Sequence, residues 1–413
     1  MENLSKRANI VLVACILFNL SIGVLYAWSV LTSHLTAPIE DGGFGWSVSQ
    51  AGLPYSIAIV TFAVSVLVGG RIQDKIGPRK VLTVGGILMG LGLILVGFVG
   101  NSVMGVILCF GVFASIGMGF GYACVTAPAL KWFHPSKKGL VSGLIVGGFG
   151  LSAVGIAPLA SALLDSFDIQ RTFIILGIFN LIVTTSIAQL IKNPPAGYAP
   201  PMPKKIKTTT KTTPSVNVDW SKMLKTRQFY MIFIIFVLTS SVGLMIIGNL
   251  TRIAQSQAGI SDAAILAGLV AFLALMNTLG RVVGGMMSDK IGRINSLYVI
   301  LGLQMINMAV FGFYQNLPML ILGLVIVGFC FGALLSVMPA LCADLYGLKN
   351  FGVNYGILFL AWGLSGVITP VIANYFYDAT GSFANAYIVC AAMMAGMVCL
   401  NFFLKRDVRT CLQ

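Results

Sequence analysis

Arg281 lies inside one of the most apolar stretches of the chain, in the sequence "ALMNTLGRVVGGMMSDKIGR" at 274–293. Its guanidinium is permanently charged and can hold a carboxylate through two parallel hydrogen bonds. Asn277 precedes it by one helical turn on the same face, where its amide can donate to the same carboxylate or to a ligand hydroxyl. An interhelical hydrogen bond is the alternative for Asn277. Together the two residues predict a site for a carboxylate anion.

The segments that must position these residues are apolar and long enough to cross a membrane. Of the 413 residues, 57% are hydrophobic and 9% are charged, and the mean hydropathy is +0.94. A soluble domain carries roughly 25% charged residues, and about 20 apolar residues span a bilayer. We therefore predict an all-α membrane protein with twelve transmembrane helices. The predicted spans lie near residues 8–33, 48–70, 80–100, 104–130, 139–164, 172–192, 228–250, 263–287, 295–314, 318–343, 351–374 and 384–404.

The acidic residues lie away from the middle of these spans. Arg281 precedes Asp289 by eight residues, so it lies about 12 Å inside the end of its helix. An arginine near the midplane costs from roughly 3 to more than 10 kcal/mol. Backbone carbonyls, tyrosines and water are ways to offset this cost, but we favour an anion in a water-accessible cavity. The acids occur in loops, tails or terminal helical turns: Glu2, Glu40, Asp41, Asp74, Asp165, Asp168, Asp219, Asp262, Asp289, Asp344, Asp378 and Asp407.

Two halves of six predicted spans repeat each other along the chain. A segment rich in Pro, Lys and Thr separates them, so we predict an N-terminal bundle over 1–192, a cytoplasmic linker over 193–227 and a C-terminal bundle over 228–413. "GGRIQDKIGPRK" after the second span is repeated 215 residues later as "GGMMSDKIGRIN" after the eighth. "PAL" and "GLS" recur at offsets of 211 and 213 residues. Internal six-helix repeats are typical of transporters, which bind their substrates near the membrane midplane.

The repeated loops place Asp74 and Asp289 in register near helix ends. There a carboxylate can cap a helix or pair with a nearby arginine, Arg79 or Arg293. Glycines in both loops let neighbouring helices approach closely. We interpret these four residues as gating residues that stabilise one conformation. A static loop turn with solvated charges is the alternative, since a surface ion pair contributes only about 0–1 kcal/mol.

The net charge of +14 is interpreted as a signal of membrane topology and not of a nucleic-acid partner, with attraction to the membrane surface as the alternative. Basic residues gather in the even-numbered loops and the tails, whereas the odd-numbered loops hold only Arg171 and Arg252. Because cytoplasmic loops are enriched in Lys and Arg, both termini are expected in the cytoplasm. The eight cysteines are scattered singly, which predicts neither disulfides nor metal ligands. The first span begins without a cleavage site, so we expect no removable signal peptide.

The repeated loops, the six-plus-six plan and the basic linker resemble the major facilitator superfamily across the whole chain. More narrowly, "YAWSV", "FGWSVSQAG", "KWFHPSKKGLVSG", "GGFGLSA" and "NYG" are similar to the oxalate/formate antiporter family and to bacterial homologues of monocarboxylate (lactate/pyruvate) transporters. The resemblance implies two six-helix bundles in the plasma membrane of a prokaryote. It implies that Arg281 binds the substrate carboxylate, and it aligns Asn277 with an aspartate that pairs with this arginine in animal monocarboxylate transporters. That departure puts an aspartate-based proton relay in doubt.

The resemblance also marks aromatic residues as substrate-lining. Tyr122 and Tyr26 match lining tyrosines of the oxalate transporter, with core tyrosines as the alternative. Phe359 and Trp362 lie one turn apart in the eleventh predicted span and predict an apolar wall, with ordinary helix packing as the alternative. Trp362 stands where the oxalate transporter has a second substrate-binding cation, a lysine. Leu25 likewise replaces a glutamine of that family.

One cation and a more apolar wall favour a substrate with a single negative charge. We therefore predict a secondary active transporter of a small monocarboxylate of the lactate, pyruvate or formate type, working by alternating access. Symport with a proton and organic-anion exchange of the oxalate:formate type both stay open, because neither histidine lies in the middle of a span. We expect a monomer in the lipid bilayer, with no cofactor and no metal. An enzyme would need a catalytic constellation, and a receptor an added signalling domain, neither of which the sequence supplies.

Overall fold

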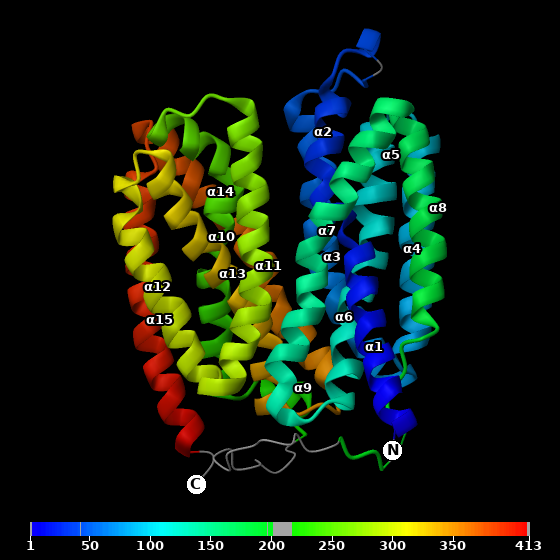
Figure 1. Ribbon diagram of the computed structural model, residues 1–413, viewed down its shortest axis with the longest axis vertical. Helices are drawn as coiled ribbons and strands as arrows, with labels where there is room; N and C mark the ends of the chain where they lie inside the picture. Colours follow the sequence, from blue (N-terminus) through cyan, green and yellow to red (C-terminus); the bar gives the residue numbers. More distant parts are fainter. Residues whose placement is uncertain (1, 42, 196, 201–216, 411–413) are drawn as a thin grey trace. The chain divides into compact units, whose positions relative to one another are not determined.

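The computed structural model describes residues 2–41, 43–195, 197–200 and 217–410, and the regular structure of these residues is helical (Figure 1). Ten of the helical segments are long and apolar enough to cross a membrane by length and composition. The other two predicted spans are occupied by α7 and α14, the latter with a shorter apolar stretch at Phe351–Gly366. The all-α prediction is thereby confirmed. The main helices are α1 (Glu2–Ser21), α2 (Trp28–Thr36), α3 (Val48–Ile76), α4 (Pro78–Phe98), α5 (Val103–Val106), α6 (Ser115–Trp132), α7 (Lys138–Ser166), α8 (Ile169–Ala188), α9 (Trp220–Met223), α10 (Arg227–Ala258), α11 (Ala263–Ile291), α12 (Arg293–Val310), α13 (Leu317–Tyr346), α14 (Phe351–Thr380) and α15 (Ala384–Thr410).

Short polar side chains begin several of these helices. Ser47 and Gln50 form a capping box at the start of α3, and Asp262 accepts hydrogen bonds from the first N–H groups of α11. Gly77 and Gly292 end α3 and α11 with φ of 86° and 88°, a left-handed backbone that favours glycine. Because each glycine is also the residue before the next helix, α4 and α12 start without a loop. The repeated sequence thus gives the same sharp turn in both halves.

Two of the predicted spans are interrupted helices. The first consists of α1, the 3-10 helix η1 (Gly23–Ala27) and α2. The fourth consists of α5, a π-helix η3 (Ile107–Ala114) and α6. The hydroxyl of Ser115 donates to the carbonyl of Phe110 five residues back, at 2.9 Å, and the Phe110 ring stacks on Trp28 with 4.2 Å between centroids. Such π-turns break the regular side-chain register of a helix, which hydropathy does not reveal.

The described residues form two compact units, which are not continuous in sequence. The described residues of the first unit lie within 1–133, 148–201 and 348–359, and those of the second lie within 134–147, 202–347 and 360–413. Residues 134–147 and 348–359 thus belong to the unit that carries the opposite half of the sequence. The predicted division into continuous halves at 192 and 228 stays a prediction. Within the predicted linker, residues 201–216 lie outside the described part of the chain. The linker ends with the short helix α9, and just before that helix the N–H of Val218 donates a hydrogen bond to the Tyr346 carbonyl.

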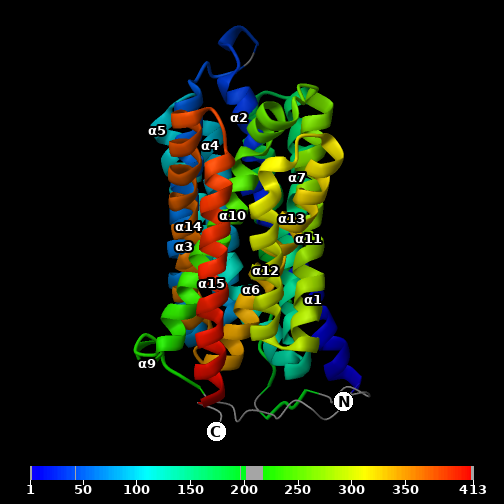
Figure 2. The same cartoon turned by 90° about the vertical axis from the view of Figure 1, so that its left-hand side faces the viewer.

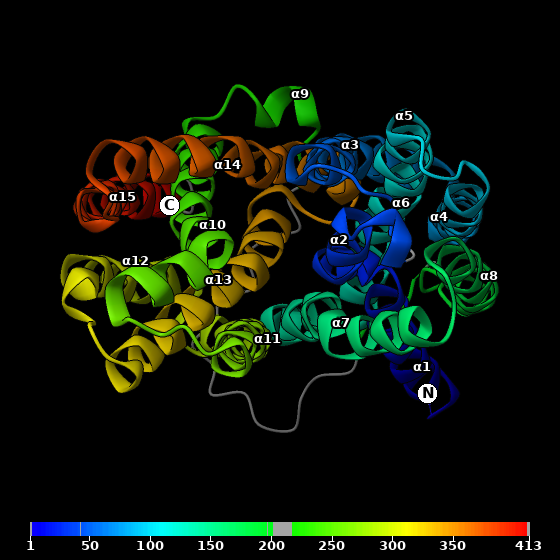
Figure 3. The same cartoon turned by 90° about the horizontal axis from the view of Figure 1, so that it is seen from above.

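Each unit is built around pairs of closely packed helices. In the first unit α4 packs against α8 and α6, and α3 against α6, as the view from above shows (Figure 3). In the second unit α11 packs against α13, and α12 runs beside α15 (Figure 2). Glycine permits these approaches, since a Cβ on Gly284 of α11 would overlap Ala333 of α13. This packing fixes the position of α11, and with it that of Arg281, within the second unit.

Candidate functional site

Arg281 is completely buried on α11, and its guanidinium has only neutral partners. Nε donates to Oδ1 of Asn277 at 3.1 Å, and Nη1 donates to the backbone carbonyl of Val146 on α7. Nη2 has no hydrogen-bond partner among the residues that the structure describes. The ion pairs of those residues likewise do not include Arg281. A buried cation with an uncommitted nitrogen is suited to bind an anion.

Asn277 acts in this structure as a hydrogen-bond acceptor for Arg281. The side chain is 8% exposed, and its oxygen lies one turn before the guanidinium on the same helix. The sequence predicted either a contact with a ligand or an interhelical bond, and this intrahelical bond was missed. An amide oxygen orients the guanidinium without cancelling its charge. The positive charge therefore stays available to an anion.

Tyr122 and Phe359, both predicted to line the site, lie in contact within the first unit. Their ring centroids are 5.0 Å apart, and both rings contact Phe62 on α3. Phe149 on α7 contacts Phe62 and Tyr122. Phe62 and Phe149 were not singled out from the sequence. Phe149 follows a pair of glycines in "GGFG", which was a usable signal because close helix contacts bring neighbouring rings together. The four buried rings form one aromatic cluster.

Tyr26 and Trp362 are the other two aromatic residues that were predicted to line the site. The backbone of Tyr26 belongs to η1, but its side chain lies outside the described part of the structure. Trp362 is buried on α14, and its carbonyl accepts a hydrogen bond from Ser365. It belongs to the second unit, whereas Phe359 belongs to the first. The predicted apolar wall made of Phe359 and Trp362 therefore stays a prediction.

Asp74 caps the first turn of α14. Its carboxylate accepts the N–H groups of Gly352 and Val353 at 3.1 and 2.9 Å. Gly70, one turn earlier on α3, meets the backbone of Gly352 so closely that a Cβ on either glycine would overlap the other chain segment. A carboxylate at a helix N-terminus is favoured both by hydrogen bonding and by the helix dipole. Asp74 thus attaches α3 to the start of α14.

Asp289 makes the matching attachment between α11 and α7. Its two carboxylate oxygens accept the N–H groups of Gly139 and Leu140 at 2.8 and 2.7 Å. Gly285 of α11 meets Gly139 of α7 in the way that Gly70 meets Gly352. The two aspartates that the repeat places in register therefore perform the same structural role.

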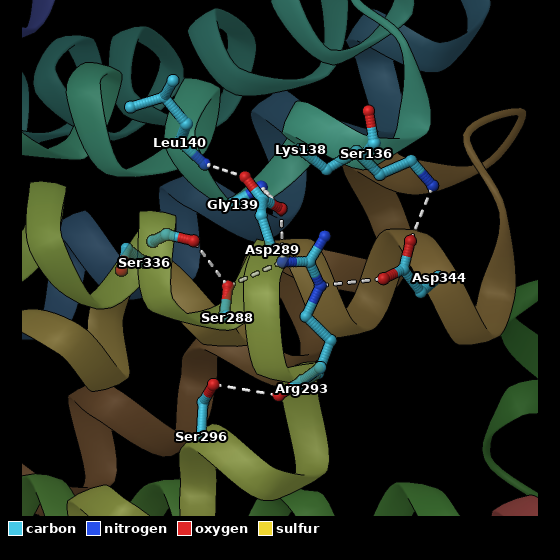
Figure 4. A network of polar contacts seen from close by, with 12 residues as sticks. Ser136, Lys138, Gly139, Leu140, Ser288, Asp289, Arg293, Ser296, Ser336 and Asp344 are labelled. Carbon is cyan, nitrogen blue, oxygen red and sulfur yellow. Dashed lines mark hydrogen bonds and ion pairs between the residues drawn. The ribbon is translucent and has the colours of Figure 1, made fainter. Parts of the chain in front are cut away.

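The second of these attachments is reinforced by a charge network (Figure 4). Arg293 binds Asp289 at 2.7 Å and Asp344 at 2.9 Å, and it also donates to the hydroxyl of Ser288. Lys138, at the start of α7, pairs with Asp344 at 2.8 Å. Lys138 and Asp344 were not predicted, because nothing in the sequence indicates that positions 206 residues apart meet.

Arg79 differs from its predicted counterpart Arg293. Its Nε donates to Oε1 of Gln189 on the segment after α8, at 2.6 Å, and no ion pair with Asp74 occurs among the described residues. Arg293 follows Asp289 by four residues, whereas Arg79 follows Asp74 by five and Pro78 takes the fourth place. This one-residue shift directs the guanidinium away from the aspartate. The two loops share a capping aspartate but not an arginine partner.

Known proteins resemble this chain over most of its length. The model of the Major Facilitator Superfamily matches residues 10–314 and 305–410. The oxalate:formate antiporter of Oxalobacter formigenes is 29% identical over 360 residues, which cover 87% of this chain and 82% of that protein. Monocarboxylate transporter 12 of Rattus norvegicus is 23% identical over 394 residues, covering 89% and 80%.

The solved structures give the same fold. The proton:xylose symporter XylE bound to 6-bromo-6-deoxy-D-glucose matches with a TM-score of 0.71 at 13% identity, covering 96% of both chains. This likeness concerns the fold alone, whereas the family model and the relatives in sequence extend it to the class of protein. The resemblance predicted from the repeated loops is therefore confirmed. The chain is a multi-pass membrane protein of the major facilitator superfamily.

Proposed function

We propose that this protein is a secondary active transporter of a small monocarboxylate, of the lactate, pyruvate or formate type, working by alternating access. The observation that carries the proposal is Arg281, a buried guanidinium with neutral partners and with Nη2 uncommitted among the described residues. A substrate carboxylate supplies the missing negative charge. Its charge-assisted hydrogen bonds are about twice as strong as those between neutral groups.

The single charge of the site favours a monoanion. Among the described residues that were predicted to bind substrate, Arg281 is the cation, whereas Tyr122, Phe359 and Trp362 are aromatic. A dianion bound to one arginine would keep a net negative charge inside the membrane, which is costly. An organic-anion exchanger is the second candidate, favoured by the similarity to the oxalate:formate antiporter of Oxalobacter formigenes.

In this proposal the capping aspartates are gating residues. Asp74 and Asp289, with Arg293 beside the latter, stabilise the conformation in which α14 and α7 are attached to α3 and α11. Arg79 would act only through Gln189. The protein would lie in the plasma membrane of a prokaryote, the inner membrane where there are two, with both termini in the cytoplasm, working as a monomer. The coupled ion is either a proton carried with the substrate or a counter-anion.

Uptake by purified protein in proteoliposomes tests the proposal directly. We expect labelled lactate, pyruvate or formate to enter faster than oxalate. A pH gradient, acid outside, should accelerate uptake if a proton is carried along. Preloading the vesicles with an unlabelled anion should accelerate it if the protein exchanges anions. Uptake of none of the four anions above that of empty liposomes would refute the proposed function.

The charge argument predicts the effect of a second cation. We expect Trp362→Lys to raise the ratio of oxalate uptake to lactate uptake by about tenfold or more, because one additional charge-assisted hydrogen bond contributes about 1.5–3 kcal/mol. Trp362→Leu, which keeps the position apolar, is the control and should leave the ratio low. An unchanged ratio in the lysine variant would show that charge matching at this position does not select the substrate.

A further inference from the structure

Two charged side chains of α11 hold the first turns of α7. Asp289 accepts hydrogen bonds from the N–H groups of Gly139 and Leu140, and eight residues earlier Arg281 donates to the carbonyl of Val146. Asp289 therefore binds N–H donors at the start of α7, and Arg281 binds a carbonyl acceptor about two turns further on. We call this pair of attachments the α7–α11 clamp. All five residues belong to the second unit.

The surfaces between these two points are in backbone contact. Gly139 and Gly143 face Gly285 and the backbone of Arg281, and a Cβ on either α7 glycine would overlap a carbonyl oxygen of α11. Gly147 continues the same stripe one turn later, but a Cβ there would lie 3.6 Å from Cγ2 of Val282, an ordinary contact. Without side chains to interlock, this segment is held by directional bonds: those of Asp289 and Arg281, and the ion pair of Lys138 with Asp344 just before it.

The helix is weak directly after the second attachment point. Val146 is followed by Gly147 and Gly148, and Gly150 is the residue whose N–H bonds the Val146 carbonyl in an α-helix. The boundary between the two units falls between Gly147 and Gly148, inside α7. The matching boundary in α14 lies in the sequence "ILFLAW" at 357–362, which has no glycine. The glycine-rich boundary therefore occurs in the helix that Arg281 holds.

We propose that the substrate carboxylate and the Val146 carbonyl compete for Arg281, so that binding of the substrate loosens the first turns of α7. This inference rests on the proposed function, because it assigns the incoming acceptor to a carboxylate. A carboxylate is a stronger acceptor than a peptide carbonyl, so it draws the Nη1–Nη2 edge of the guanidinium to itself. The segment 138–147 then depends on Asp289, on the ion pair of Lys138 with Asp344 and on the weak helix at Gly147 and Gly148. Arg281 therefore both binds the substrate and, when it does so, releases the Val146 carbonyl of α7.

Amide hydrogen exchange of the full-length protein in lipid nanodiscs tests the competition. We expect amides of residues 141–150 to exchange about fivefold faster in Arg281→Met than in the wild type, because one hydrogen bond is lost while the bulk is kept. Saturating L-lactate, pyruvate or formate should accelerate the exchange of these amides in the wild type to a similar extent. The same anions should cause no further acceleration in Arg281→Met. Exchange in α10 should stay unchanged in every sample.

Gly147→Ala is the matched variant that leaves the clamp in place. Alanine fits at this position and strengthens the helix, so the acceleration caused by the monocarboxylate should shrink by about fivefold. Unchanged exchange in Arg281→Met would overturn the clamp. Uptake of a monocarboxylate together with unchanged or slower exchange in the wild type would overturn the competition and leave the proposed function intact. If the protein neither bound nor transported any of these anions, the proposed function and the competition would both be overturned. Faster exchange in Arg281→Met would still establish the clamp.

Discussion

Arg281→Ala should lower monocarboxylate uptake at least about 100-fold while the protein still folds. The loss follows because two charge-assisted hydrogen bonds to the substrate disappear, each contributing about 1.5–3 kcal/mol. Folding should persist because, among the described residues, Arg281 has no acidic partner that its removal would leave buried and unpaired. Initial uptake rates in proteoliposomes, with the thermal midpoint of the purified variant, measure both effects.

Two further variants show whether the charge of Arg281 causes the loss. Arg252→Ala removes an exposed arginine from the end of α10 and should leave uptake unchanged. Asn277→Asp keeps the acceptor for Nε but makes it anionic, so it should neutralise the guanidinium and lower uptake at neutral pH. If Arg281→Ala transported normally, the assignment of the anion site would be wrong.

Asp289→Asn should impair transport more than Asp74→Asn. Both changes weaken the capping of a partner helix, since each aspartate accepts one backbone N–H group on each of its two carboxylate oxygens and asparagine has only one accepting oxygen. Only Asp289 also binds an arginine, and that arginine is 10% exposed. Its loss leaves the largely buried Arg293 with Asp344 alone, so we expect at least about a tenfold fall in uptake for Asp289→Asn and a smaller one for Asp74→Asn.

Asp262→Asn provides the control for this comparison. Asp262 caps α11 at its other end and is exposed. It accepts both of its backbone N–H groups on Oδ1, an oxygen that asparagine keeps, so uptake should be unchanged. An equal or larger defect in Asp74→Asn would show that the charge network around Arg293 adds nothing to gating.

The sequence predicted the positions of charged groups better than their partners. The burial of Arg281 and the register of Asp74 with Asp289 follow from hydropathy and from the internal repeat, which are properties of the chain itself. The contact between Arg281 and Val146 does not follow from these properties, because every residue has a backbone carbonyl and the pattern of side chains does not show which carbonyl is used. Arg79 shows a second limit, since a single added residue after Gly77 changed its partner from an aspartate to Gln189.

Interrupted helices are a third feature that the sequence did not predict. Hydropathy averages over a whole span, so the apolar run 104–130 does not reveal that η3 separates α5 from α6. The side chains after such a π-turn face differently from those of a regular helix. Tyr122, which follows η3, lies with Phe359 in one buried aromatic cluster, and its predicted lining role stays a prediction.

The two capping aspartates also differ in when the ribosome makes them. Asp74 is synthesised 278 residues before Gly352, so the start of α14 finds its cap as soon as it emerges. Asp289 is synthesised 150 residues after Gly139, so the start of α7 is capped only after α11 has been inserted. Since chains fold progressively during synthesis, the first turns of α7 are completed late although α7 itself is made early. A nascent chain that stalls before Asp289 would therefore carry a frayed fifth span.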